Sequence, residues 1–162
     1  MQNTINRYED LLDLLRKDGV LHQANLEDYS ATIPTGRGEL RGVLVIRWQA
    51  EQGVAQLVQS LPFQVPADRL SAYEAALARL NHALLIPCFG INHETSTPYY
   101  RLALPLFAGR PPRIEDVRAA FRTAVKTAAD FLPALRRVAL EGANPETIVA
   151  DARVDIALSE GA

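Results

Sequence analysis

The chain has 162 residues, of which 48% are hydrophobic and 22% charged, and its formal net charge is −2. This length and composition are typical of one soluble domain with a hydrophobic core. The slight acidity argues against bulk attraction to nucleic acid or to an anionic membrane. A single cysteine excludes an intramolecular disulfide. No apolar run reaches the roughly 18 residues of a membrane span. We therefore expect a cytoplasmic protein.

The N-terminal segment predicts an amphipathic helix over Thr4–Lys17, and it lacks the apolar core of a signal peptide. Asn3 or Thr4 is a suitable N-cap, and Gly19 follows where a left-handed residue ends many helices. The next stretch, 20–38, is ambiguous. It predicts at most a short strand around Asp28–Ile33, followed by a turn rich in glycine and proline.

Two strands joined by a tight turn are predicted next, over residues 39–49 and 54–65. The first alternates strongly between two faces. One face carries Leu40, Leu44, Ile46 and Trp48, and the other carries Arg41, Val43, Val45 and Arg47. This alternation is typical of a strand with one buried and one partly exposed face.

The second half of the chain predicts a helix over 66–84, strands over 84–94 and 98–106, and a helix from about Arg113 that Pro133 bends or ends. The order is α-β-β-β-α-β-β-α. Hairpin connections predict a largely antiparallel sheet. Helices on one face of that sheet would complete an α+β fold.

The C-terminal segment differs from the rest in charge. Residues 141–162 carry five acidic residues and one basic residue, Arg153. We interpret residues 1–140 as a single domain and residues 141–162 as an acidic tail with weak order. Apolar residues within the tail allow it to dock on the domain or on a partner.

The segment "LPFQVPADRLSAYEAALARLNHALLIPCFGINHETSTPYYRLALPL" resembles the YbjN-like family. The shared features are a strand ending near proline, Leu80-Asn81 at the end of a helix, Phe89-Gly90-Ile91 in a strand, and Tyr100-Arg101-Leu102 in the next strand. The resemblance covers roughly residues 1–140. It implies a fold like that of type III secretion chaperones and a non-enzymatic, usually dimeric protein that binds or regulates other proteins. It implies no catalytic residues and no cofactor.

Three reactive side chains lie close together in the sequence: His82, Cys88 and His93. Their spacing does not match the paired short spacings of zinc sites. In a strand over 85–93, Cys88 and His93 would point to opposite faces, which argues against a cysteine nucleophile with a histidine base. We interpret all three as structural and predict no catalytic or metal site.

Asn81 ends an apolar helical stripe just before a strand. It suits a helix C-cap, because asparagine tolerates left-handed geometry. The alternative is a buried amide that holds the helix to the sheet.

The last predicted helix carries Arg118, Arg122 and Lys126 at intervals of four residues. A basic row of this kind suits phosphate or an acidic protein partner, and a solvated helix face is the simpler interpretation. The net acidity argues against nucleic acid.

Tyrosine and arginine are common at protein interfaces, which makes the polar faces of the central strands candidate partner or dimer surfaces. The candidate residues are Arg41, Val43, Val45, Arg47, Tyr99 and Arg101. Simple exposure to solvent is the alternative. We hypothesise a homodimeric, polypeptide-binding chaperone or regulatory adaptor. The competing hypothesis is a small-molecule binder or small enzyme with a pocket between the sheet and the last helix.

Overall fold

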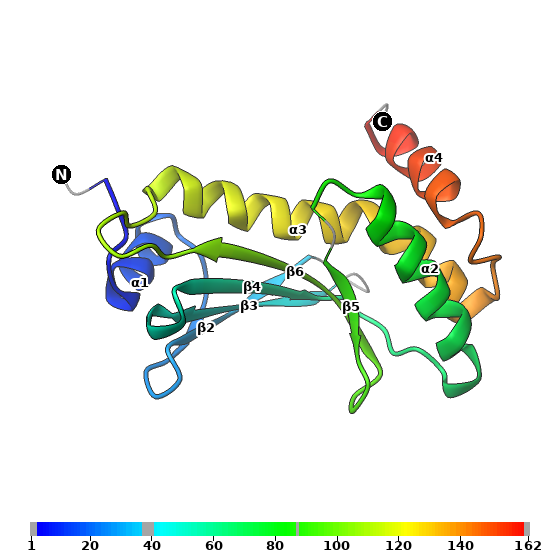
Figure 1. Ribbon diagram of the computed structural model, residues 1–162, viewed down its shortest axis with the longest axis horizontal. Helices are drawn as coiled ribbons and strands as arrows, with labels where there is room; N and C mark the ends of the chain where they lie inside the picture. The colour runs from blue at the N-terminus through cyan, green and yellow to red at the C-terminus, as the bar shows by residue number, and fades with distance from the viewer. Residues whose placement is uncertain (1–2, 37–40, 87, 161–162) are drawn as a thin grey trace. The chain divides into compact units, whose positions relative to one another are not determined.

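The computed structural model describes residues 3–36, 41–86 and 88–160, and six strands in these ranges form one sheet (Figure 1). The strands are β1 (Gln23–Asn25), β2 (Ser30–Thr35), β3 (Gly42–Gln49), β4 (Val54–Ser60), β5 (Phe89–Asn92) and β6 (Thr97–Pro105). Their order across the sheet is β1-β2-β3-β4-β6-β5, and the β1–β2, β2–β3, β3–β4 and β5–β6 pairs are antiparallel. The predicted α+β class with an antiparallel sheet is confirmed.

The same ranges contain four α-helices: α1 (Tyr8–Lys17), α2 (Leu70–Ala83), α3 (Ile114–Arg136) and α4 (Ile148–Glu160). Short 3-10 turns span Ala50–Gln52 and Ala67–Arg69, and a π-helical turn spans Arg137–Glu141. Helix α3 continues past Pro133 to Arg136. An end of the helix at this proline, one of the two predicted outcomes, does not occur.

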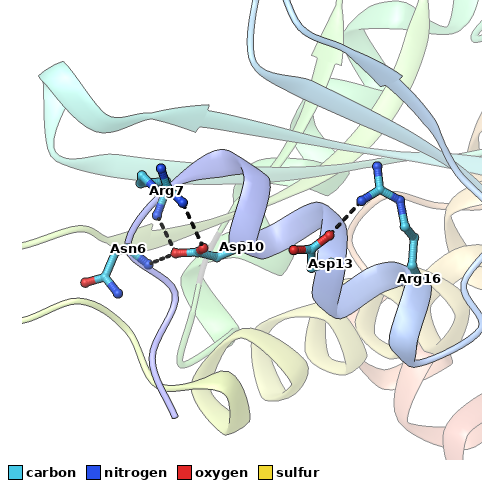
Figure 2. Close-up of polar contacts among 5 residues, drawn as sticks. All are labelled: Asn6, Arg7, Asp10, Asp13 and Arg16. Carbon is cyan, nitrogen blue, oxygen red and sulfur yellow. Dashed lines mark hydrogen bonds and ion pairs between the residues drawn. The ribbon is translucent and has the colours of Figure 1, made fainter. Parts of the chain in front are cut away.

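Helix α1 begins later than its sequence predicts, and neither Asn3 nor Thr4 caps it. Thr4 instead forms a β-bridge with Arg113. The N-cap residue is Arg7, and the capping contact comes from Asp10, whose carboxylate accepts the backbone N–H groups of Asn6 and Arg7 at 2.9 and 3.1 Å (Figure 2). This backward contact fixes the start of the helix, because it satisfies donors that no earlier turn can pair. Gly19 has φ of +68°, as predicted for the residue after the helix.

The strands differ from their predicted bounds, by a single residue at each end in β6 (Thr97–Pro105) and by more in others. β1 was not predicted, and β2 begins at Ser30 rather than Asp28. β4 ends at Ser60, because Pro62 follows and proline cannot donate to a strand ladder. β5 covers only Phe89–Asn92 of the predicted 84–94. Leu40, predicted for the buried face, lies outside the described residues.

The chain forms two compact units. The first comprises residues 1–59 and 101–125, so it holds α1, β1, β2, β3 and parts of β4, β6 and α3. Side chains of α1 (Leu14, Leu15), β3 (Ile46) and α3 (Val117, Phe121) line one cavity. Both helices therefore lie on the face of β3 that buries Leu44, Ile46 and Trp48. In this unit the helices thus cover one face of the sheet, as the sequence predicts.

The second unit comprises residues 60–100 and 126–162. Its core includes Tyr73, Tyr100 and Leu135, each almost completely buried. The Phe89 ring of β5 contacts both Tyr100 and Phe131, with ring centres 4.9 and 5.6 Å apart.

The C-terminal segment was expected to be weakly ordered and to dock on the domain or on a partner; it is instead helical, and it packs within the second unit. Residues 148–160 form helix α4, which contacts α2. Ile148 and Ala152 lie four residues apart, on one side of the helix, and both are fully buried. Arg137 pairs with Asp155 of α4 at 2.8 Å. The single domain over residues 1–140 stays a prediction.

Candidate partner-binding surface

The polar face of β3 is the first part of the candidate site. We call Arg41, Val43, Val45 and Arg47 the outer face. Arg41 directly precedes β3, and along the strand the other three positions alternate with buried residues, as the sequence predicts. Arg41 and Arg47 are exposed, Val43 is 39% exposed and Val45 is half-buried. The outer face therefore combines accessible apolar surface with two cationic side chains.

A hollow of about 640 Å³ opens beside the outer face. Val45 and Arg47 of β3, Thr32 of β2, and Asn25 and Glu27 of the β1–β2 hairpin contribute to its lining. The hollow is mainly polar in character. It offers both hydrogen-bond donors and hydrogen-bond acceptors, which a surface that binds a polypeptide backbone requires.

Strand β1 forms one end of the sheet, next to this hollow. It pairs only with β2, so one side of its backbone has no neighbouring strand among the described residues. All three of its residues are exposed. Two leucines that flank the strand are also exposed, Leu21 at 81% and Leu26 at 66%. Sequence analysis missed this edge, because three exposed residues show no alternation.

Tyr99 and Arg101 lie on β6 but belong to different units. Arg101 is exposed in the first unit. Tyr99, in the second unit, is the register partner of Gly90. A Cβ atom at Gly90 would lie 2.6 Å from the Tyr99 ring, so the glycine leaves room for that ring. Tyr99 is therefore partly engaged in packing on β5.

The basic residues of α3 have different surroundings. Arg118 donates to Asp18 at 2.8 and 2.6 Å and to Glu115 at 2.7 Å. The hydrogen bond from Arg118 lowers the pKa of Asp18. Lys126 pairs with Asp130 at 2.7 Å. Arg122 is exposed at the rim of the cavity between α1, β3 and α3. Two of the three predicted cations are thus already neutralised by neighbouring carboxylates.

The cysteine and histidines do not assemble into a cluster. Neither Cys88 nor His93 lies within β5, so strand pleating does not determine how they point. His93 Nε2 lies 3.4 Å from Glu74 Oε1 on the surface. No group of three or more potential metal ligands occurs within residues 3–36, 41–86 and 88–160.

Asn81 has the second of its two predicted roles. Its amide donates to the carbonyl oxygen of Phe89 at 2.8 Å and accepts the Phe89 N–H at 2.9 Å. Helix α2 continues beyond it to Ala83. The side chain therefore fixes the start of β5 to α2.

The chain belongs to the YbjN family, whose model matches residues 9–137 and is described as "Putative bacterial sensory transduction regulator". The predicted membership is confirmed, and the predicted regulatory role is consistent with the description of the family. No curated protein and no solved structure matches the chain. The likeness to secretion chaperones consequently stays a prediction. None of the described helices is long and apolar enough to cross a membrane.

Proposed function

We propose that this protein is a non-enzymatic regulatory adaptor of the cytoplasm that binds a polypeptide on the outer face and acts as a homodimer. The observation that carries the proposal is the combination of the outer face, the hollow beside it and the unpaired edge of β1. The family description supports a regulatory role. A surface of this composition suits protein contact, in which apolar side chains are surrounded by polar groups.

The binding mode follows from the edge strand. An extended peptide that adds to β1 would receive backbone hydrogen bonds, while its side chains enter the hollow next to Val45. Arg47 at the hollow would favour an acidic residue of the partner. Leu26, exposed in the adjoining turn, would supply an apolar contact.

Site-specific photo-crosslinking in the native cell tests this mode. A photo-reactive amino acid at Val43 or Leu26 should give a discrete cross-linked species that the Arg47→Glu substitution weakens. The same amino acid at Ala119, which is exposed on α3, is the matched control. Equal cross-linking from all three positions, or none from Val43 and Leu26, would contradict the proposed surface.

Light scattering during size-exclusion chromatography tests the homodimer separately. We expect twice the mass of the 17.8 kDa chain at micromolar concentration. A monomer under these conditions would remove the dimer from the proposal and leave the polypeptide surface to be judged by cross-linking.

The cavity between α1, β3 and α3 supports a second candidate function, the binding of a small anion that carries an apolar chain. It has a volume of about 430 Å³ and an apolar lining that includes Leu14, Ile46 and Phe121. Arg122 lies at its rim. Medium-chain carboxylates should then raise the thermal unfolding temperature of the protein, and Arg122→Gln should abolish the rise. No rise with any carboxylate would eliminate this candidate.

A further inference from the structure

A separate cavity of about 470 Å³ lies in the first unit, lined by the start of α1, the β1–β2 turn and the end of β3. Tyr8, Tyr29 and Trp48 contribute aromatic side chains to its lining, one from each of these segments. The rings of Tyr8 and Tyr29 meet edge to face, with centres 5.8 Å apart. Aromatic side chains from three separate segments thus line one cavity, as in sites that bind organic cations.

Tyr29 is held in an unusual backbone conformation at this cavity. Its φ is +50°, which is uncommon for a residue with a bulky side chain. Its side chain is nevertheless 51% exposed, so burial in the core does not explain the conformation. A strained, exposed aromatic residue beside a cavity is a reason to look for a ligand.

The charge around the cavity is negative. Glu9, Asp28 and Glu51 all contribute to its lining, and within the described residues no lysine or arginine lies at ion-pair distance from them. Arg7 is the one cation in the lining, and it lies 3.7 Å from Asp10 (Figure 2). Burial raises the pKa of Tyr8, and the carboxylates of Asp28 and Glu9 raise it further. The cavity therefore favours a positive group.

The N-terminus of α1 does not reverse this preference. A helix N-terminus carries partial positive charge that would repel a cation. Here the carboxylate of Asp10 accepts the N–H groups of Asn6 and Arg7 and offsets that charge (Figure 2).

Two buried polar atoms of the lining have no hydrogen-bond partner among the described residues. They are the indole Nε1 of Trp48, a residue only 5% exposed, and the side-chain oxygen Oε1 of Gln49. Buried donors and acceptors are almost always paired. A ligand with a carbonyl oxygen beside its cation would offer a partner to the Trp48 N–H.

We propose that this cavity binds an organic cation, an ammonium or guanidinium group, carried either by a basic residue of a polypeptide or by a free amine. The exposed Tyr29 ring provides cation–π surface, with the buried Tyr8 and Trp48 rings behind it. Glu9, Asp28 and Glu51 provide the opposing charge. The residues that line this cavity differ from those of the outer face and of the hollow beside it. Asp28 is the one residue that lines both the cavity and the hollow. The inference therefore does not depend on the proposed polypeptide surface.

Trp48 is the only tryptophan of the chain, so tryptophan fluorescence detects binding near it, and the charge variants below assign that binding to this cavity. The purified full chain is titrated with three capped tripeptides, Gly-Arg-Gly, Gly-Lys-Gly and Gly-Glu-Gly, and with the free amines spermidine and tetramethylammonium. We expect a saturable change with the basic peptides or amines and none with the acidic peptide. Saturation by peptides but not amines assigns the cation to a polypeptide, and the reverse assigns it to a free amine.

Charge variants decide whether the response comes from this cavity. Glu9→Gln and Glu51→Gln should each weaken binding about fivefold, the effect of losing one partly solvated charge contact. Glu94→Gln is the matched control, because Glu94 is an exposed acid in the corresponding turn of the β5–β6 hairpin. Thermal unfolding confirms that each variant is folded. Equal responses to acidic and basic peptides, or binding unchanged in both cavity variants, would overturn the proposal.

Discussion

The β1–β2 and β5–β6 hairpins contain the same turn but use it differently. In each, an asparagine ends the first strand, and its side-chain oxygen accepts the backbone N–H two residues later. Asn25 accepts from Glu27 and Asn92 from Glu94, both at 2.9 Å. In each, the last residue of the turn has positive φ, +50° at Tyr29 and +53° at Ser96.

The two hairpins differ in the residue with positive φ and in the contact that holds each hairpin to a helix. In the β5–β6 hairpin, a small serine occupies the left-handed position, and Asn81 holds the first strand through Phe89. In the β1–β2 hairpin, a tyrosine occupies that position, and the Tyr8 hydroxyl donates to the carbonyl of Ser30. Because a serine occupies this position in the other hairpin, the turn itself does not require an aromatic or large side chain at its last residue. The Tyr29 ring instead packs edge to face on Tyr8 and lines the cavity described above.

The largest effect is expected at the contact that holds the β5–β6 hairpin. Asn81→Leu removes both hydrogen bonds and leaves the Phe89 N–H and carbonyl without them, so the free energy of unfolding should fall by about 2–3 kcal/mol. Urea denaturation measures the change. Asn81→Asp retains an acceptor for the N–H and should lose less. A loss below about 1 kcal/mol for the leucine variant would show that solvent replaces the contact.

A smaller effect is expected for the contact of the β1–β2 hairpin. Tyr8→Phe removes one buried hydrogen bond and should lower the free energy of unfolding by about 1–2 kcal/mol at neutral pH.

The same hydroxyl predicts a pH dependence. Burial raises the pKa of Tyr8 above its ordinary value of 10.0. The contribution of the Tyr8 hydroxyl to the free energy of unfolding is then complete below about pH 10. It is lost as the pH rises through the folded-state pKa of Tyr8. Denaturation curves between pH 8 and pH 11 should therefore converge for the wild type and Tyr8→Phe. Curves that stay parallel would contradict this role.

Glycine substitutions compare the two left-handed residues directly. Ser96→Gly should stabilise the protein by up to about 1 kcal/mol, because relief of backbone strain exceeds the entropy cost of glycine. Tyr29→Gly gains the same relief but loses the ring contact with Tyr8, about 0.5–1.5 kcal/mol, so its net effect should be near zero. Equal stabilisation by both substitutions would mean that the Tyr29 ring contributes nothing to the folded state.

The smallest effect is expected from the ion pair between Arg118 and Asp18, which lies outside both hairpins. Because the pKa of Asp18 is lowered in the folded state, its stabilisation is present above about pH 4 and is lost as pH falls through the folded-state pKa. Asp18→Asn should lower the thermal unfolding temperature slightly at pH 7 and leave it unchanged near pH 2. Arg122 forms no ion pair within the described residues, so Arg122→Gln should show no such pH dependence.

Much of the fold follows from periodicity. The alternation along β3 predicted both its buried residues and the outer face, because successive side chains of a strand point to opposite faces of the sheet. The start of α1 was harder, since Asp10 acts backward along the chain. The edge strand β1 has no alternation at all.

The cavity lined by Tyr8, Tyr29 and Trp48 could not be predicted from the sequence. Its lining comes from three separate segments, and Tyr29 is not a residue type that indicates a turn. One signal was available. "NLEDYS" and "NHETST" share asparagine, then glutamate two residues later, then serine or threonine after three more. Comparison of these segments would have predicted two similar hairpins and drawn attention to Tyr29.

Helix α4 changes how the length of this protein should be understood. The family match ends at residue 137, but Ile148 and Ala152 beyond it are fully buried, and their helix contacts α2. A recombinant fragment cut at the family boundary would expose apolar side chains that the full chain covers. The segment that the family model covers is therefore shorter than the segment that packs together in this chain.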